Sequence, residues 1–272
     1  MNSIRLIAMD MDGTLLNSRQ KLSAGNIAAL RAAEEKGVKL AICSGRPAGD
    51  TSMFAVTHGF DRMAILSMNG GYCLDRPFGT PYADYAIERD TALQCFQWFR
   101  ERNMTFACFM QNEIAAFAGE AAAEDIYWCA PWNDPRAPRI LKGEEAVRRF
   151  TEGRVNKFVC IERDQEQLQA LGRRLETLPG LEITSSWADN YELMPQGVSK
   201  GRAVKELAEK MGIGPDQVMT VGDFDNDLSM IEYAGYGTAM GNATPKVKAA
   251  AKYVTLTNDE DGVAAAIRKY VL

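Results

Sequence analysis

A short apolar stretch at the start of the chain is ended by two aspartates, and this junction constrains the fold most. The stretch Ile4–Met9 runs directly into Asp10-Met11-Asp12-Gly13-Thr14. Continuous apolar runs of this length are typical of strands that helices cover on both faces. The sequence therefore predicts a buried strand with two carboxylates at its C-terminal end, the edge of an open α/β sheet where ligands bind.

The two carboxylates of Asp10 and Asp12 stand one residue apart and repel each other, and burial strengthens that repulsion. One of them stays ionised at neutral pH only if a cation lies beside it or the other keeps its proton. The pair therefore predicts a metal site, a role in proton transfer, or both.

Strands and helices alternate on both sides of a long central segment, which predicts a parallel sheet built from βαβ units. We expect right-handed connections between them. These elements predict a doubly wound, Rossmann-like α/β domain over residues 1–83 and 191–272. The expected strands are 4–9, 38–43, 64–67, 218–221 and 236–239, and the expected helices are 23–36, one from Pro47, 200–211, 225–233, 244–251 and 261–271.

The alternation changes near Asp84, which predicts an inserted α+β domain over residues 84–190. A chain of 272 residues is long for a single core, so two domains agree with its length. Within the insert we expect a helix inside 83–102, a strand pair at 105–110 and 113–117, a loop-like stretch through 132–138, a strand at 155–161, a helix at 165–177 and a strand at 181–185.

The composition of the chain limits the classes of function that are expected. The chain has 31 Lys and Arg against 36 Asp and Glu, a formal charge of −5, which gives no support for nucleic-acid binding. The six cysteines form no CxxC pair, so we expect reduced, buried thiols. The N-terminal apolar run is too short and too interrupted for a signal peptide or a membrane span, which predicts a cytoplasmic protein. We expect a monomer or a small homo-oligomer.

Four groups of polar residues stand at the ends of strands or the start of a helix in the outer domain. Because parallel strands that follow one another end at the same edge of a sheet, the four groups can converge. They are Asp10 with Asp12, Ser44-Gly45-Arg46, Lys200, and Gly222-Asp223-Phe224-Asp225-Asn226-Asp227.

Each group alone also has an ordinary structural interpretation. Aspartates favour turns and helix starts, Ser-Gly is a common turn pair, and a lysine at a helix end is usually solvated. Arg46 either contacts substrate or pairs with the inserted domain. We expect His58 to be a surface or packing residue, and Met110, Trp128 and Trp132 to be core residues of the insert.

Taken together, the motifs DMDGT, SGR, VSKG and GDFDND resemble those of the haloacid dehalogenase superfamily, and within it the Cof-type sugar-phosphate phosphatases. The order of the motifs and the insertion between the second and third agree, and the resemblance covers the whole chain. Downstream, Met240–Ala243 and Asn258–Val263 are similar to the family's recurrent tail. SGR stands where TGR is commoner, and serine keeps the hydroxyl.

The resemblance implies roles that suit phosphoryl transfer. Asp10 would be the nucleophile that forms an aspartyl-phosphate, and Asp12 would protonate the leaving alcohol and then activate water. Lys200 would be a fixed positive charge shared by the phosphate and Asp10. The turn at Gly13 and Thr14 would bring backbone N–H groups to the phosphate, whose oxygens Ser44 and Gly45 would bind.

The same resemblance implies a Mg²⁺ site and a lid. Asp223, the Asp10 carboxylate and the Asp12 backbone carbonyl would hold the ion, with Asn226 and Asp227 as further metal-side groups that orient a ligand water and Lys200. The inserted domain would exclude bulk water during transfer.

The sequence therefore predicts a Mg²⁺-dependent phosphatase acting on a small phosphorylated metabolite such as a sugar phosphate. Two alternatives stay open: a phosphomutase of the phosphomannomutase-like type, and a phosphometabolite sensor with negligible turnover. Members of the family accept sugar phosphates, pyridoxal phosphate or flavin mononucleotide, so the substrate itself is left open.

Overall fold

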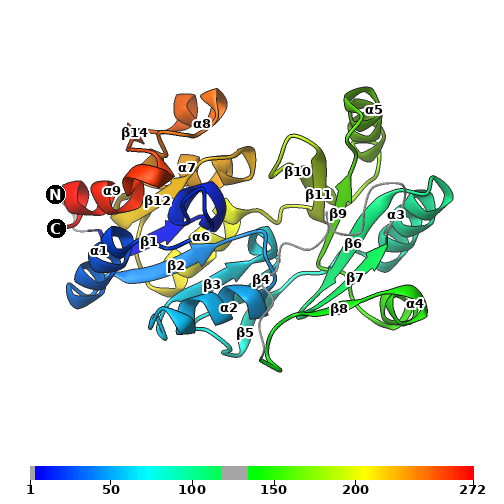
Figure 1. The fold of residues 1–272 in the computed structure, drawn as a ribbon, viewed down its shortest axis with the longest axis horizontal. Helices are drawn as coiled ribbons and strands as arrows, with labels where there is room; N and C mark the ends of the chain where they lie inside the picture. Colours follow the sequence, from blue (N-terminus) through cyan, green and yellow to red (C-terminus); the bar gives the residue numbers. More distant parts are fainter. Residues whose placement is uncertain (1–3, 118–133) are drawn as a thin grey trace.

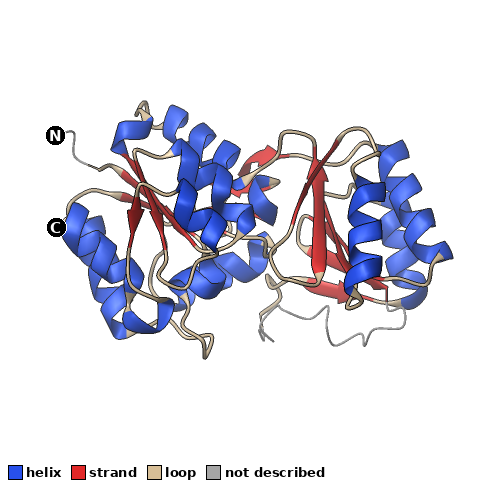
Figure 2. Cartoon of the chain, turned by 90° about the horizontal axis from the view of Figure 1, so that it is seen from above, coloured by secondary structure: helices blue, strands red, loops and turns tan. Residues whose placement is uncertain are grey.

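The computed structural model describes residues 4–117 and 134–272, which form two α/β bodies side by side (Figures 1 and 2). We call them the core and the cap. The core contains both ends of the described chain, and the cap is inserted between β5 and α6. Within these ranges, none of the helices combines the length and the apolar character that crossing a membrane requires.

The core is built on an eight-stranded sheet in the order β14-β13-β12-β1-β2-β3-β4-β5. The strands from β13 to β3 are parallel, as predicted. The sequence pattern did not indicate the further parallel strand β14, nor β4 and β5, which form an antiparallel extension. Their bounds are β1 Leu6–Met9, β2 Lys39–Cys43, β3 Ala64–Ser67, β4 Tyr72–Leu74, β5 Pro81–Asp84, β12 Val218–Gly222, β13 Tyr236–Ala239 and β14 Tyr253–Val254.

Helices cover both faces of the core sheet, which makes the fold doubly wound (Figure 2). Alternate residues of β1 point to opposite faces: Ile7 and Met9 pack in one hydrophobic cluster, and Leu6 and Ala8 in another. The core helices are α1 Ala24–Glu35, α2 Ala48–Thr57, α6 Lys200–Lys210, α7 Leu228–Tyr233, α8 Pro245–Ala250 and α9 Gly262–Tyr270.

The cap contains a six-stranded, mostly antiparallel sheet in the order β10-β11-β9-β6-β7-β8. Its strands are β6 Thr105–Met110, β7 Glu113–Phe117, β8 Arg139–Leu141, β9 Lys157–Ile161, β10 Leu181–Thr184 and β11 Asn190–Pro195, and its helices are α3 Arg89–Glu101, α4 Gly143–Glu152 and α5 Gln165–Leu175. The helices lie on the outer side of the sheet, and the other side faces the core (Figure 2).

The two faces of the cap sheet pack in different clusters. Phe106 and Cys108 of β6 point toward the cap helices, whereas Phe109 points the other way and joins a cluster that includes Met68 of the core. The open face of the cap sheet thus rests on the residue that follows β3.

Three cap elements were not anticipated: β8, α4 and β11. The omission of β11 matters most, because the boundary expected at residue 191 falls inside this cap strand. The return to the core lies between Pro195, the last residue of β11, and Lys200, the first of α6. The first boundary, expected at 83/84, falls before Asp84, the last residue of β5.

His58, Met110 and five of the six cysteines lie in the described parts of the chain. His58 follows α2, where its ring stacks at an angle on Phe54 and Nδ1 lies 2.8 Å from the Phe54 carbonyl oxygen, so it is a packing residue. Met110 is buried in the cap core. Five cysteines are free and buried; Cys129, Trp128 and Trp132 lie outside the described residues.

Candidate active site

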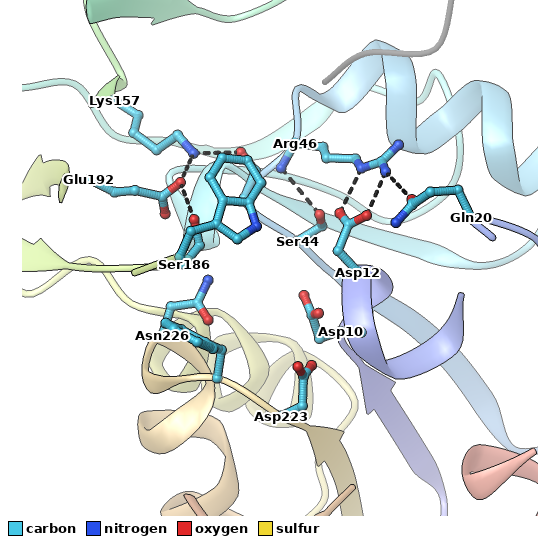
Figure 3. Close-up of a pocket in the computed structure, with 14 residues that line it drawn as sticks. Asp10, Asp12, Gln20, Ser44, Arg46, Lys157, Ser186, Glu192, Asp223 and Asn226 are labelled. Atoms are coloured by element: carbon cyan, nitrogen blue, oxygen red, sulfur yellow. Dashed lines mark hydrogen bonds and ion pairs between the residues drawn. The ribbon is translucent and has the colours of Figure 1, made fainter. Parts of the chain in front are cut away.

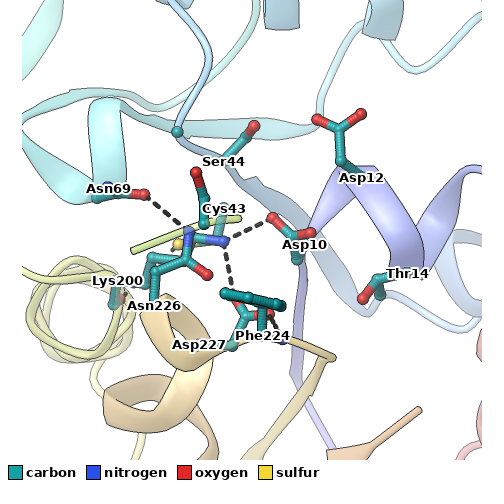
Figure 4. Close-up of polar contacts among 12 residues, drawn as sticks. Asp10, Asp12, Thr14, Cys43, Ser44, Asn69, Lys200, Phe224, Asn226 and Asp227 are labelled. Carbon is teal, nitrogen blue, oxygen red and sulfur yellow. Dashed lines mark hydrogen bonds and ion pairs between the residues drawn. The ribbon is translucent and has the colours of Figure 1, made fainter. Parts of the chain in front are cut away.

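Polar residues from distant parts of the chain meet where β1, β2 and β12 end (Figure 4). Met9 of β1 pairs with Ile42 of β2 on one side and with Val221 of β12 on the other, so the segments that follow these strands lie at one edge of the sheet. Lys200 joins them from the first residue of α6, whose N-terminus is capped by the Ser199 side chain. All four groups singled out from the sequence therefore converge.

Lys200 links two of these segments. Its Nζ donates hydrogen bonds to Asp10 Oδ1 and Asp227 Oδ1, both at 2.6 Å, and its side chain is fully buried. Burial alone would lower the pKa of the ammonium, but Asp10 and Asp227 outweigh it and raise the pKa well above the ordinary value. Lys200 is therefore a permanent positive charge at the centre of the site.

One lysine does not balance the acids around it. Carboxylate oxygens of Asp10, Asp223 and Asp227 lie within 4.8 Å of one another. Burial raises the pKa of Asp10 well above its usual range despite Lys200, and Asp227 and Asp223 raise it further. Burial and the charge of Asp227 also raise the pKa of Asp223 to about 7. A cluster of oxygen donors with surplus negative charge fits a hard divalent cation such as Mg²⁺.

The turn after β1 is shaped to fit against Asp223. Gly13 has a φ of +76°, and a Cβ at this position would lie 2.4 Å from Asp223 Oδ2, so only glycine fits. The Thr14 hydroxyl donates a 2.6 Å hydrogen bond to Asp223 Oδ1. Thr14 therefore orients the Asp223 carboxylate, a contact that differs from the turn-ordering and phosphate-binding roles that the sequence suggested for it.

The second carboxylate of the motif, Asp12, points toward Arg46 (Figure 3) and away from Lys200 (Figure 4). Arg46 donates two hydrogen bonds to this carboxylate, from Nε to Oδ2 at 2.8 Å and from Nη2 to Oδ1 at 2.6 Å. The guanidinium also pairs with the buried Asp50 at 3.0 Å and donates to Gln20 at 3.1 Å. These partners all belong to the core. None of them belongs to the inserted domain, with which Arg46 was expected to pair if it did not contact substrate.

The segment after β2 lines the cavity together with Asp12. Ser44 is buried, and its Oγ accepts a hydrogen bond from the Arg46 backbone N–H at 3.2 Å. A Cβ on Gly45 would lie 3.2 Å from Lys157 Nζ and 3.3 Å from Asn69 Oδ1. The lack of a side chain at Gly45 thus lets the cap approach this loop closely.

The loop after β12 is held together by one carboxylate. Asp227 Oδ2 accepts the backbone N–H groups of Asp223 at 2.8 Å and Phe224 at 3.1 Å, while Oδ1 accepts from Lys200. Asn226 faces the cavity and donates to Asn69 Oδ1 at 3.4 Å (Figure 4). Asp227 is therefore well placed to fix the loop that carries Asp223.

A buried polar cluster of the cap, which sequence reasoning missed, completes the site. Lys157 of β9 donates to Glu192 of β11 at 2.9 Å and to the Gly45 carbonyl oxygen at 2.7 Å, and Asn69 donates to Glu192 at 2.5 Å. Burial would raise the pKa of Glu192, but Lys157 and Asn69 lower it below the ordinary value. The sequence held a partial signal for burial only, since Lys157 directly precedes the apolar run Phe158–Ile161 and Glu192 directly precedes Leu193 and Met194.

Core and cap together enclose a cavity of about 490 Å³ above Asp10. Ser186 and Trp187 from the cap and Phe224 from the core also line it, whereas Lys200 and Asp227 are not among the lining residues. The other site residues in the lining are Asp10, Asp12, Gly13, Gln20, Ser44, Gly45, Arg46, Lys157, Glu192, Asp223 and Asn226. A cavity of this size holds a small metabolite.

Comparison with known proteins identifies the family. The model of haloacid dehalogenase-like hydrolases matches residues 7–267. The chain belongs to this family. The resemblance drawn from the sequence motifs is thereby confirmed, and so are the doubly wound core, the inserted cap and the assignment as a phosphoric monoester hydrolase.

Individual relatives of this hydrolase match over their full length. The phosphatase YwpJ of Bacillus subtilis is 33% identical, over 96% of this chain and 98% of its own. YcsE of the same organism, a 5-amino-6-(5-phospho-D-ribitylamino)uracil phosphatase, is 33% identical over 99% and 96%. A solved structure of a haloacid dehalogenase-like hydrolase from B. subtilis has a TM-score of 0.85 at 30% identity, covering 99% of this chain and 100% of that chain.

Proposed function

We propose that this hydrolase is a Mg²⁺-dependent phosphatase that removes phosphate from small phosphorylated metabolites through an aspartyl-phosphate on Asp10. The observation that carries the proposal is the position of Lys200, fully buried between Asp10 and Asp227 with Asp223 beside them. Relatives that are phosphatases, among them one acting on a phosphorylated ribityl compound, support the substrate class.

In this proposal Asp10 attacks phosphorus, and Lys200 neutralises charge on both Asp10 and the transferring oxygens. Ser44 and the Gly45 N–H bind the remaining phosphate oxygens, next to the turn at Gly13. Asp12 lines the same cavity, where Arg46 orients its carboxylate, and serves as the acid for the leaving alcohol and then as the base for water.

The metal site in this proposal consists of the Asp10 and Asp223 carboxylates, with the Asp12 backbone carbonyl, Asn226 and Asp227 around them. The observation that favours it is the surplus of buried carboxylates, two of which, Asp10 and Asp223, have pKa values raised by burial and by the neighbouring acids. When bound, Mg²⁺ supplies charge neutralisation on the transferring phosphoryl oxygens.

The test is Asp10→Asn, which keeps the shape of the side chain and removes its charge. Turnover of p-nitrophenyl phosphate in Mg²⁺ should fall by at least about 10³-fold while the folded structure persists, as circular dichroism would show. The exposed Asp61→Asn is the matched control and should keep full activity. Substantial turnover by folded Asp10→Asn, or binding of phosphometabolites by the wild type without phosphate release, would refute the proposal.

A further inference from the structure

The cavity above Asp10 contains cations, but each is already engaged by carboxylates of the protein. Of the described residues that line it, only Arg46 and Lys157 are cationic, and Asp10, Asp12, Asp223 and Glu192 are acidic. The charge that this lining can offer a ligand therefore depends on how firmly the two cations are held.

Arg46 is held by two carboxylates at once. Its Nε and Nη2 form a bidentate pair with Asp12, and its Nη1 binds Asp50, whose side chain is completely buried. Turning the guanidinium toward a ligand would leave the buried Asp50 charge without this partner, which is strongly unfavourable. Arg46 is therefore a fixed partner of the core acids.

Lys157 is equally committed. Its side chain is 1% exposed, and its ammonium binds Glu192 and the Gly45 carbonyl oxygen (Figure 3). The ammonium also lies 4.6 Å from the centre of the Phe109 ring. Because Glu192 is just as buried, the pair is neutral as a unit. The cap wall of the cavity thus presents a satisfied ion pair and no surplus positive charge.

The other described residues of the lining carry no charge. Ser186, Trp187 and Gln20 offer a hydroxyl, an indole and an amide, and Phe224 offers a ring. The segment 118–133 contains Glu120, Glu124 and Asp125 and neither Lys nor Arg, so its side chains can add no cation to any part of the site. Aromatic faces with a few polar groups suit uncharged ring or polyol bodies.

We propose that the cavity selects phosphate monoesters whose leaving group is uncharged, and rejects the same skeleton when it carries a second phosphate or a carboxylate. The inference rests on the proposed function and deepens it, because it concerns the part of the substrate that leaves. A second anion in this cavity would face carboxylates and satisfied cations, and such like-charge contact opposes binding.

The same charge pattern bears on the phosphomutase alternative. An enzyme that returns a phosphoryl group to a second hydroxyl has to hold a bisphosphate with both phosphates bound. Among the described residues, one group is placed to bind phosphate: Ser44 and Gly45 in the lining, together with Lys200, which is not itself a lining residue but is bonded to Asp10. The pattern therefore favours hydrolysis over phosphoryl return.

The decisive measurement compares matched substrates on the wild-type enzyme in Mg²⁺. One pair is sorbitol 6-phosphate and 6-phosphogluconate, which differ by a hydroxymethyl group and a carboxylate; the other is glucose 6-phosphate and glucose 1,6-bisphosphate. Each compound is assayed for phosphate release and as an inhibitor of p-nitrophenyl phosphate turnover. We expect the charged member of each pair to be about 10²-fold worse in kcat/KM or in Ki.

The outcomes separate this inference from the proposed function. If p-nitrophenyl phosphate and all four compounds release no phosphate, the proposed function fails. If phosphate is released or turnover is inhibited but the charged and uncharged members differ by less than about threefold, hydrolysis stands and the charge selection is overturned.

A pair of variants tests the physical cause. Trp187→Arg adds a cation to the lining, and Trp187→Gln removes the same ring without adding charge. The charged member of each pair should improve by about tenfold relative to the uncharged one in Trp187→Arg, while Trp187→Gln should keep the wild-type ratio. Identical ratios in the two folded variants would contradict the proposal; should Trp187→Arg not fold, the wild-type comparison still decides.

Discussion

Two lysines lie fully buried within the same active-site region, and their surroundings differ. Among the described residues, the ammonium of Lys200 in the core binds the carboxylates of Asp10 and Asp227, whereas that of Lys157 in the cap binds the Glu192 carboxylate and the Gly45 carbonyl oxygen. Asp223 adds a further acid to the core group. The cap pair is balanced, and the core cluster carries surplus negative charge.

The buried carboxylates show the consequence. The pKa of Glu192 lies below its usual range because Lys157 outweighs burial, whereas burial prevails in the core and raises the pKa of Asp10 and of Asp223. A balanced pair is complete as folded, while an unbalanced cluster still needs a cation. We infer that the core cluster carries out the chemistry and that the cap pair positions the cap on the core. Variants of the two clusters test this distinction.

The largest expected effect is the loss of activity in Lys200→Met. Removing this cation leaves Asp10 and Asp227 facing each other and takes away positive charge from the transferring phosphate. We expect kcat/KM for p-nitrophenyl phosphate to fall by about 10²–10³-fold. Lys157→Met is the matched variant in the cap and should lose less than about tenfold. Equal losses in the two folded proteins would erase the distinction between the clusters.

The next largest effect is on stability, and it concerns the cap pair. Lys157→Met leaves the Glu192 carboxylate buried without its cation, which should lower the free energy of unfolding by about 3–5 kcal/mol. Adding Glu192→Gln removes the stranded charge and should recover most of that loss, because a neutral amide of the same shape needs no counter-ion. Urea unfolding measures both; a double variant no more stable than Lys157→Met would show that the charge is not the cause.

The core cluster could be anticipated from sequence because its residues directly follow strands. Asp10, Ser44 and Asp223 each come within two residues of an apolar strand end, and parallel strands bring such ends together. Asn69 obeys the same rule, since it follows β3 by two residues, and could have been found in this way. What sequence could not show is orientation, such as the turning of Asp12 toward Arg46.

The cap cluster could not be anticipated, because its contacts depend on how the cap sits on the core. Lys157 and Gly45 are 112 residues apart, and Asn69 and Glu192 are 123 apart. The strand that carries Glu192 was also missed, since the prediction assigns residues from 191 onward to the core. The apolar neighbours of Lys157 and Glu192 indicated burial but gave no partner.

A smaller effect, on the pH dependence of metal stabilisation, follows from the raised pKa values. The pKa of Asp223 rises from 3.8 to about 7 on folding without metal, so the metal-free protein should lose stability as pH increases through this range. Above about pH 5.5, Glu192 is ionised in both the folded and the unfolded state and adds no slope. Mg²⁺ should therefore stabilise the protein more at about pH 8 than at about pH 5.5; at a hundred times the Kd that applies at pH 8, its stabilisation at that pH is about 2.7 kcal/mol. Thermal melts with Mg²⁺ or a chelator measure this; equal increments at both pH values would contradict it.

The smallest effect separates two hydroxyls that each donate to a buried carboxylate, Thr14 to Asp223 at 2.6 Å in the core and Ser186 to Glu192 at 3.1 Å in the cap. Thr14→Val keeps the side-chain shape but removes the donor, which raises the pKa of Asp223 further and loosens its orientation. We expect Mg²⁺ to bind about tenfold more weakly, as titration calorimetry would show. Ser186→Ala leaves Glu192 with Lys157 and Asn69, so Mg²⁺ affinity should not change. If both variants weakened Mg²⁺ equally, the cap pair would share the metal site and the two clusters would be one.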